Sequence, residues 1–135
     1  MSRQRWRALL EVILAGWVMA ALYAAAASTV GPQSLVPLPY WMTAVGDVVV
    51  GAWLALLAIE LRRMVIEVAA SSVVAAVAYF ALLVSAATGA PDYYAQLIDY
   101  ALVEIVPVLL LSLFLALIGS LVGTVINASA RGIEL

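Results

Sequence analysis

A glutamate inside the first apolar run is the residue of this sequence best placed to do chemistry. Glu11 lies in the segment LLEVILAG, about one helical turn into the run. A carboxylate in a membrane costs about 2–3 kcal/mol at mid-membrane on insertion scales, and less near an edge. Glu11 could bind a proton or a cation that the protein transports. It could also pair with Arg7, four residues earlier on the same helical face, and we favour that structural interpretation.

A second group of charges lies in the stretch AIELRRMVIE at residues 58–67. Glu60 and Arg63 are three residues apart, and Arg63 and Glu67 are four residues apart. On one continuous helix these side chains would form a ladder of ion pairs along one face. Alternatively, the chain turns near residues 62–64, and the charges mark a boundary of the membrane.

Further acids lie near the predicted ends of apolar runs. Asp47 and Glu104 are examples, and an acidic surface there could attract cations. We favour the simpler interpretation, that acids are tolerated where a span ends. Pro107 costs little if its helix starts near Glu104, and it kinks the helix if the start is earlier.

Several residue types that carry chemistry are missing. The chain has no cysteine and no histidine. This composition excludes disulfides, thiol catalysis, thiolate metal sites and the commonest metal and haem ligand. The sequence shows no nucleophile–base pair, metal-ligand cluster, phosphate-binding loop or basic nucleic-acid patch. We therefore expect no enzymatic activity, no cofactor, no metal and no nucleic-acid partner.

The composition indicates that the natural solvent of this chain is lipid. Of its 135 residues, 67% are hydrophobic and only 10% are charged. Soluble domains are about 45–50% apolar, and a small domain leaves much of its surface in water. The lipid bilayer is thus the expected partner. The length leaves no room for a separate soluble domain beside the membrane-embedded part.

Four apolar runs predict the elements that must position these residues. They lie at about residues 8–30, 44–61, 68–89 and 102–126. Each run is near the length of about 20 residues that crosses a bilayer, and a backbone inside lipid must be helical to satisfy its own polar groups. The first run is longer than a signal peptide allows and contains Glu11, so we expect it to be retained. The predicted fold is an all-α polytopic membrane protein, with residues 1–135 as a single domain of four transmembrane helices.

The arginines predict the orientation of these spans. They precede the first run, lie between the second and third, or follow the fourth: Arg3, Arg5, Arg7, Arg62, Arg63 and Arg131. The opposite loops, at about residues 31–43 and 90–101, contain no basic residue. The positive-inside rule therefore places both termini in the cytoplasm, in a multi-pass protein of the cell membrane.

Small residues at four-residue spacing predict faces where helices approach closely. Gly16, Ala20 and Ala24 form such a face in the first run, and Gly119 and Gly123 form one in the fourth. These faces join helices either within one chain or between chains.

Two families share features with this sequence. The stretch WLALLAIELRR, at residues 53–63, resembles the second span of the phosphate-starvation-inducible PsiE-like membrane proteins, in which a leucine-rich segment precedes Glu-Leu and a basic residue. Their basic residue at the end of span three is missing here. That resemblance implies four spans, both ends inside and a stress-linked role. The opening of the first run also resembles the small multidrug resistance transporters, whose span-one glutamate binds protons and cationic drugs, and this implies such a role for Glu11.

Two functions follow as expectations. The leading one is a structural, accessory or regulatory membrane protein that acts through helix contacts, as a homo-oligomer or as a subunit of a larger assembly. The alternative is an oligomeric transporter or channel for a cation or small solute. It would need a polar cavity lined by Glu11, or by Ser71, Ser72 and Tyr79.

Overall fold

The computed structural model describes residues 2–27, 40–58 and 60–132. The elements are helices, in the order α1 (Arg3–Ala27), α2 (Tyr40–Leu57), α3 (Leu61–Thr88), the short 3-10 helix η2 (Pro91–Tyr93) and α4 (Tyr94–Ala130). No β-strand occurs in the described residues, so the predicted all-α class is confirmed. The predicted loop at residues 31–43 lies mostly outside the described residues.

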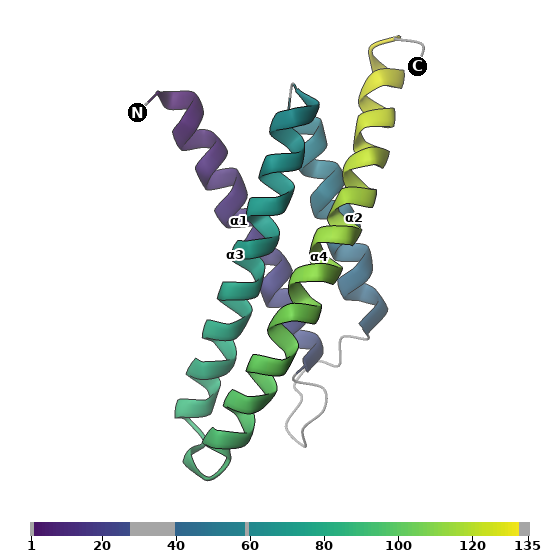
Figure 1. Cartoon of the computed structure of the whole chain (residues 1–135). Coiled ribbons are helices and arrows are strands. Elements are labelled where there is room, and N and C mark those ends of the chain that lie inside the picture. The colour runs from purple at the N-terminus through teal and green to yellow at the C-terminus, as the bar shows by residue number, and fades with distance from the viewer. Residues whose placement is uncertain (1, 28–39, 59, 133–135) are drawn as a thin grey trace.

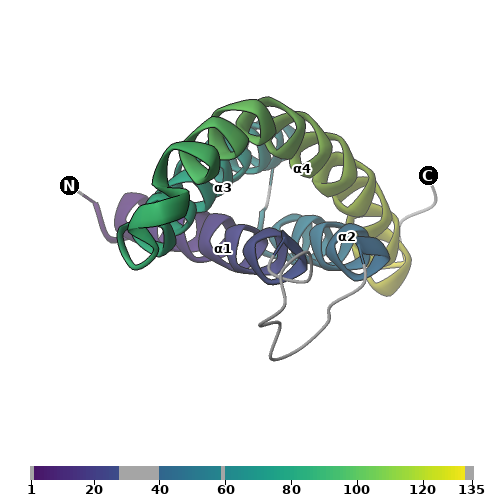
Figure 2. The ribbon, with the colours of Figure 1, turned by 90° about the horizontal axis from the view of Figure 1, so that it is seen from below.

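The helices form two layers (Figures 1 and 2). Helices α1 and α2 lie side by side in one layer, and α3 and α4 arch over them in the other. The most extensive contacts join α2 to α4, α1 to α3, and α3 to α4. Each helix of the first layer therefore packs on a different helix of the second.

All six arginines belong to segments at one end of the bundle. Figure 1 shows the start of α1, the junction of α2 with α3 and the end of α4 at that end. The opposite end holds the connection from α3 to α4, which carries Asp92 and has Asp99 close by in α4. The bundle therefore has a basic end and an end without basic side chains among the described residues.

The distribution of side-chain sizes is the reverse of that in a soluble protein. More than half of the buried apolar residues described are alanines, and glycines and serines fill much of the remaining interior. Large side chains such as Trp17, Val77, Leu110 and Phe114 face outward, Phe114 with 63% of its surface exposed. Small residues let the backbones approach closely, and large apolar ones suit a lipid surround.

Three helical segments are long and apolar enough to cross a membrane: Arg3–Ala26, Leu61–Thr88 and Pro91–Ala130. The apolar part of α2, Trp41–Leu57, is shorter. The sequence predicted four runs of spanning length, and the helix of the second run is shorter than the other three.

The helix boundaries differ most from the predicted runs at the starts of α3 and α4. Helix α2 ends at Leu57, and α3 begins at Leu61 instead of near residue 68. Arginine and glutamate are good helix formers, which explains why the charged stretch belongs to α3. Helix α4 begins at Tyr94, so most of the predicted second outer loop is helical.

Pro107 consequently lies in the interior of α4 and not in its first turn. Its missing N–H leaves the carbonyl of Val103 without the usual helical hydrogen bond. Val103 lies on the outer face of the bundle, where 69% of the residue is exposed. The helix nevertheless continues unbroken through the proline to Ala130.

Candidate functional site

A chain of four charged side chains joins α1 to α3 at the basic end. The Nε atom of Arg7 donates a hydrogen bond to Oε1 of Glu11 over 2.7 Å. Arg63 reaches the same carboxylate from α3, with Nη2 lying 3.6 Å from Oε2 of Glu11. The Nε atom of Arg63 also donates to Oε1 of Glu67 over 2.5 Å. We call these four residues the α1–α3 charge chain.

Burial explains why these charges are paired. Glu11 and Glu67 are 7% and 4% exposed, whereas Arg7 is exposed. A buried charge without a partner is costly, and removing one member of a buried pair leaves such a charge behind. Arg63 lies between the two buried carboxylates and interacts with both. The charge chain therefore ties the start of α1 to the start of α3.

One of the two ion pairs of the predicted ladder is present. Arg63 and Glu67 pair along α3, whereas Glu60 precedes the helix in an extended conformation, with φ −121° and ψ 137°. Glu60 is exposed and forms no ion pair with the described residues. Glu11 from α1 provides the second carboxylate for Arg63. The pair of Glu11 with Arg7 was expected from their spacing, but its contact with Arg63 was not, because the two residues are far apart in sequence.

Asp47 is completely buried in the interior. The hydroxyl of Tyr23 in α1 donates a hydrogen bond to Oδ2 of Asp47 in α2 over 2.8 Å. The Tyr23 ring meets Tyr79 of α3 edge to face, with 6.4 Å between ring centroids and an interplanar angle of 74°. The second oxygen, Oδ1, accepts no hydrogen bond from the described residues. Three helices thus converge around one partly satisfied carboxylate.

Sequence reasoning interpreted Asp47 as an acid tolerated at the end of a span, and its burial was missed. One signal could have found it, because Asp47 is the only charged residue between Glu11 and Glu60. An ionisable residue isolated in so long an apolar context is expected to face the interior of a bundle. Glu104, the other acid in that interpretation, is half-buried in α4.

The predicted small-residue faces lie in helix contacts within the chain. A Cβ atom added at Gly119 would overlap the backbone carbonyl of Val48 in α2, and one added at Gly51 would overlap that of Ala116 in α4. Gly123 meets α2 in the same way at Ala52. The backbones of α2 and α4 therefore touch along this line.

The corresponding face of α1 packs against α3. A Cβ atom at Gly16 would lie 2.5 Å from Cγ1 of Val74. Ala20 is fully buried, and Ala24 packs against the cluster around Tyr23 and Tyr79. Both predicted faces thus act in packing inside one chain.

The buried serines hydrogen-bond within their own helices. Ser71 donates to the carbonyl of Glu67 over 2.7 Å, and Ser72 donates to that of Val68 over 3.0 Å. These hydroxyls therefore donate their hydrogen bonds to the backbone of α3. They do not line either of the two cavities described next, and neither do Glu11 and Tyr79.

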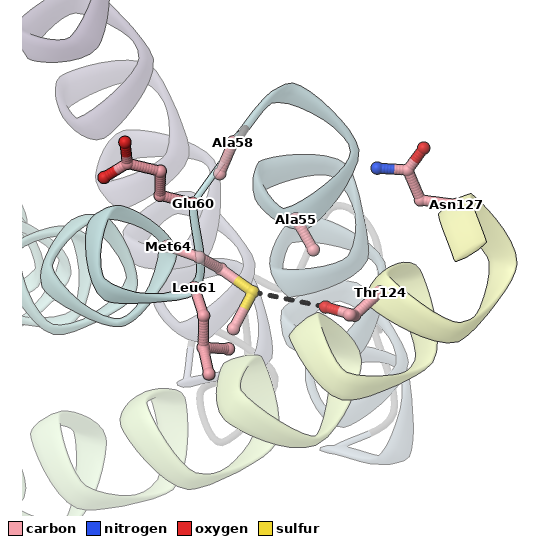
Figure 3. A pocket seen from close by; sticks show the side chains of 7 residues that line it. All are labelled: Ala55, Ala58, Glu60, Leu61, Met64, Thr124 and Asn127. Carbon is pink, nitrogen blue, oxygen red and sulfur yellow. Dashed lines mark hydrogen bonds between the residues drawn. The ribbon is translucent and has the colours of Figure 1, made fainter. Parts of the chain in front are cut away.

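A small cavity lies where α2, α3 and α4 meet at the basic end (Figure 3). Its volume is about 90 Å³, and it is lined by Ala55, Ala58, Glu60, Leu61, Met64, Thr124 and Asn127. The Thr124 hydroxyl lies 3.5 Å from the sulfur of Met64. In Figure 3 the carboxylate of Glu60 points away from this contact. A cavity of this size and polarity suits water molecules.

A larger groove, of about 840 Å³, opens between the first halves of α1 and α3. We call it the α1–α3 groove. Three arginines, two glutamates and several apolar side chains line it: Arg5, Arg62, Arg63, Glu60, Glu67, Ala8, Leu9, Val12, Ile66 and Ala70. It is the larger of the two cavities, and it combines charged with apolar side chains, with one more cation than anion.

In the described part of the chain, no group of three or more acidic, histidine or cysteine side chains could hold a metal ion. Comparison with known proteins identifies no relative, since no family model, no curated protein and no solved structure matches the chain.

Proposed function

We propose that this chain is an integral membrane protein whose four helices span the bilayer, with both termini in the cytoplasm. The observation that carries the proposal is the outward placement of large apolar side chains over an interior of small ones. The three long apolar helices support it. Helix α2 has 18 residues, which is within the range of about 17–25 residues for a span.

The arginines support the orientation. They gather at the end of the bundle that holds the start of α1, the start of α3 and the end of α4. Basic residues are enriched on the cytoplasmic side of membrane proteins. An even number of spans brings both termini to that side.

We further propose a structural or accessory role, as a homo-oligomer or as a subunit of a larger membrane assembly. The α1–α3 charge chain and the hydrogen bond between Tyr23 and Asp47 join helices to one another, and the hydroxyls of Ser71 and Ser72 are bonded within α3. Two arginines engage Glu11, which favours a structural role for it over the transport of cations. The stress-linked, PsiE-like context stays a prediction.

Labelling of single cysteines tests the orientation, because the natural chain contains no cysteine. Ser129→Cys marks the basic end, and Asp92→Cys marks the opposite end. We expect a membrane-impermeant maleimide to label Asp92→Cys in intact cells and to label Ser129→Cys only after permeabilisation. Labelling of Ser129→Cys in intact cells would contradict the orientation.

Native mass spectrometry in mild detergent tests the role. We expect a homo-oligomer or a complex with another chain, and a strictly monomeric particle would contradict the proposal. Flux measurements in proteoliposomes test the transporter alternative, with Glu11→Gln as the variant. Cation flux that is lost in Glu11→Gln would favour transport over the accessory role.

A further inference from the structure

The α1–α3 groove changes from charged to apolar along both of its walls. Figure 1 shows the first half of α1 diverging from α3 toward the basic end, where both helices begin. On the α1 wall, Arg5 precedes Leu9 and Val12; on the α3 wall, Arg62 precedes Ile66. On both walls arginines lie near the end of the bundle and apolar side chains lie farther in, while the α3 side also carries Glu60 and the Arg63-paired Glu67.

The arginines that line the groove differ in whether they already form ion pairs. Arg63 already interacts with Glu11 and Glu67. Arg5 and Arg62 are exposed and form no ion pair with the described residues. Two guanidinium groups, one from each wall, are thus available to an anion.

The surrounding charge also favours an anion. Residues 3–11 and 60–67 together carry five arginines and three glutamates, a net charge of +2: Arg3, Arg5, Arg7, Arg62 and Arg63 against Glu11, Glu60 and Glu67. Two of these glutamates are held in the charge chain. A guanidinium group presents paired N–H donors that match the geometry of a phosphate.

We propose that the α1–α3 groove binds an anionic glycerophospholipid. Arg5 and Arg62 hold the phosphodiester, and an acyl chain lies against Leu9, Val12 and Ile66. The volume of about 840 Å³ is in the range of ligand sites, and basic pockets between membrane helices on the cytoplasmic side suit anionic headgroups. The proposal rests on the membrane insertion proposed above. The apolar wall favours a lipid over a soluble phosphate, because a free phosphate gains nothing from it.

The first test compares retention of two lipids by native mass spectrometry. The protein is purified in detergent with equal amounts of phosphatidylglycerol and phosphatidylcholine. We expect the wild type to retain phosphatidylglycerol preferentially, and Arg5→Gln and Arg62→Gln each to weaken it about fivefold. Arg131→Gln is the matched control, because Arg131 lies at the same end of the bundle but outside the groove.

A second pair of variants tests the apolar wall without changing any charge. Ala70 lines the groove, whereas Ala81 is exposed farther along α3. We expect Ala70→Trp to fill the groove and abolish the preference for phosphatidylglycerol. Ala81→Trp should retain it. Circular dichroism confirms that each variant is folded.

Three results would overturn the proposal. The first is equal retention of the two lipids by the wild type. The second is an Arg131→Gln variant that loses as much binding as Arg62→Gln, which would show attraction to the general surface charge. The third is displacement of the lipid by glycerol phosphate alone, which would show a site for a soluble phosphate.

Extraction of membranes with alkaline carbonate separates the failure of this proposal from the failure of membrane insertion. Release of the protein by carbonate would contradict membrane insertion itself. A protein that resists carbonate but shows no lipid preference would contradict only lipid binding in the groove.

Discussion

Replacement of Gly119 by alanine should destabilise the bundle, because α2 and α4 touch there through their backbones. The added Cβ would overlap the carbonyl of Val48, which is fixed in α2 and has no rotamer to change. The two helices must separate instead. A separation of about 0.5–1 Å forfeits a quarter to a half of the dispersion energy of each facing atom pair.

Two effects of opposite sign determine how much Gly119→Ala changes the free energy of unfolding. Alanine is favoured over glycine in a helix by about 0.5–1 kcal/mol. Overpacking of a tight interface costs about 1–3 kcal/mol, and in this contact the clash is with backbone. We therefore expect Gly119→Ala to lower the free energy of unfolding by about 1–2 kcal/mol net.

A double variant and a control sharpen this expectation. Gly51 meets Ala116 across the same interface, so one separation of the helices relieves both clashes. The variant Gly51→Ala with Gly119→Ala should lose less stability than the sum of the two single variants. Gly89→Ala is the control, because its Cβ would meet nothing closer than 3.5 Å and its φ is −81°. It should stay within about 0.5 kcal/mol of the wild type.

Equilibrium unfolding in mixed micelles measures these differences, with circular dichroism and the fluorescence of the tryptophans as probes. Gly119→Ala with wild-type or higher stability would refute the reasoning, because helix propensity would then outweigh the contact. Strict additivity in the double variant would show that the two glycines do not share one interface.

Three further predictions concern buried polar groups and the helix interior. Tyr23→Phe should destabilise the fold by about 1 kcal/mol, because it removes a hydrogen-bond donor to Asp47. Adding Asp47→Val to Tyr23→Phe should recover this loss. A double variant less stable than Tyr23→Phe alone would contradict this. Arg63→Gln should lower the free energy of unfolding by about 1–3 kcal/mol, because it deprives two buried carboxylates of their shared cation. Arg62→Gln should leave the stability nearly unchanged. Equal losses in the two variants would count against the charge chain. Pro107→Ala should raise the thermal midpoint by restoring a hydrogen bond to the carbonyl four residues earlier, and a lowered midpoint would contradict that explanation.

Local patterns in the sequence predicted the helices and their small-residue faces. Apolar runs indicate helices because a backbone in lipid must bond to itself, and four-residue spacing brings residues such as Gly119 and Gly123 onto one face. The pair of Arg7 and Glu11 follows from the same spacing. These features depend only on residues close together in the chain.

Contacts between distant segments could not be predicted in this way. Nothing in the spacing of Glu11 and Arg63 indicates that α1 and α3 lie together. The burial of Asp47 likewise depends on how α1 and α4 pack on α2. Helix ends were the other failure: the fourth run was predicted to start near residue 102, yet Tyr94–Ala130 is continuous helix.

The unequal lengths of α2 and α4 have a consequence for the surrounding membrane. Helix α4 has 37 residues and α2 has 18, which corresponds to about 55 Å and about 27 Å along the helix axis. In the membrane-spanning arrangement proposed above, α4 would have to tilt or protrude from a hydrocarbon layer of about 30 Å, while α2 would barely span it. Lipid next to α4 would then be stretched and lipid next to α2 compressed, so the protein would impose a lateral gradient of bilayer thickness. The stability of the protein in bilayers of increasing acyl length should pass through a shallow maximum. A steady rise or fall would show that one helix alone determines the best-matching bilayer thickness.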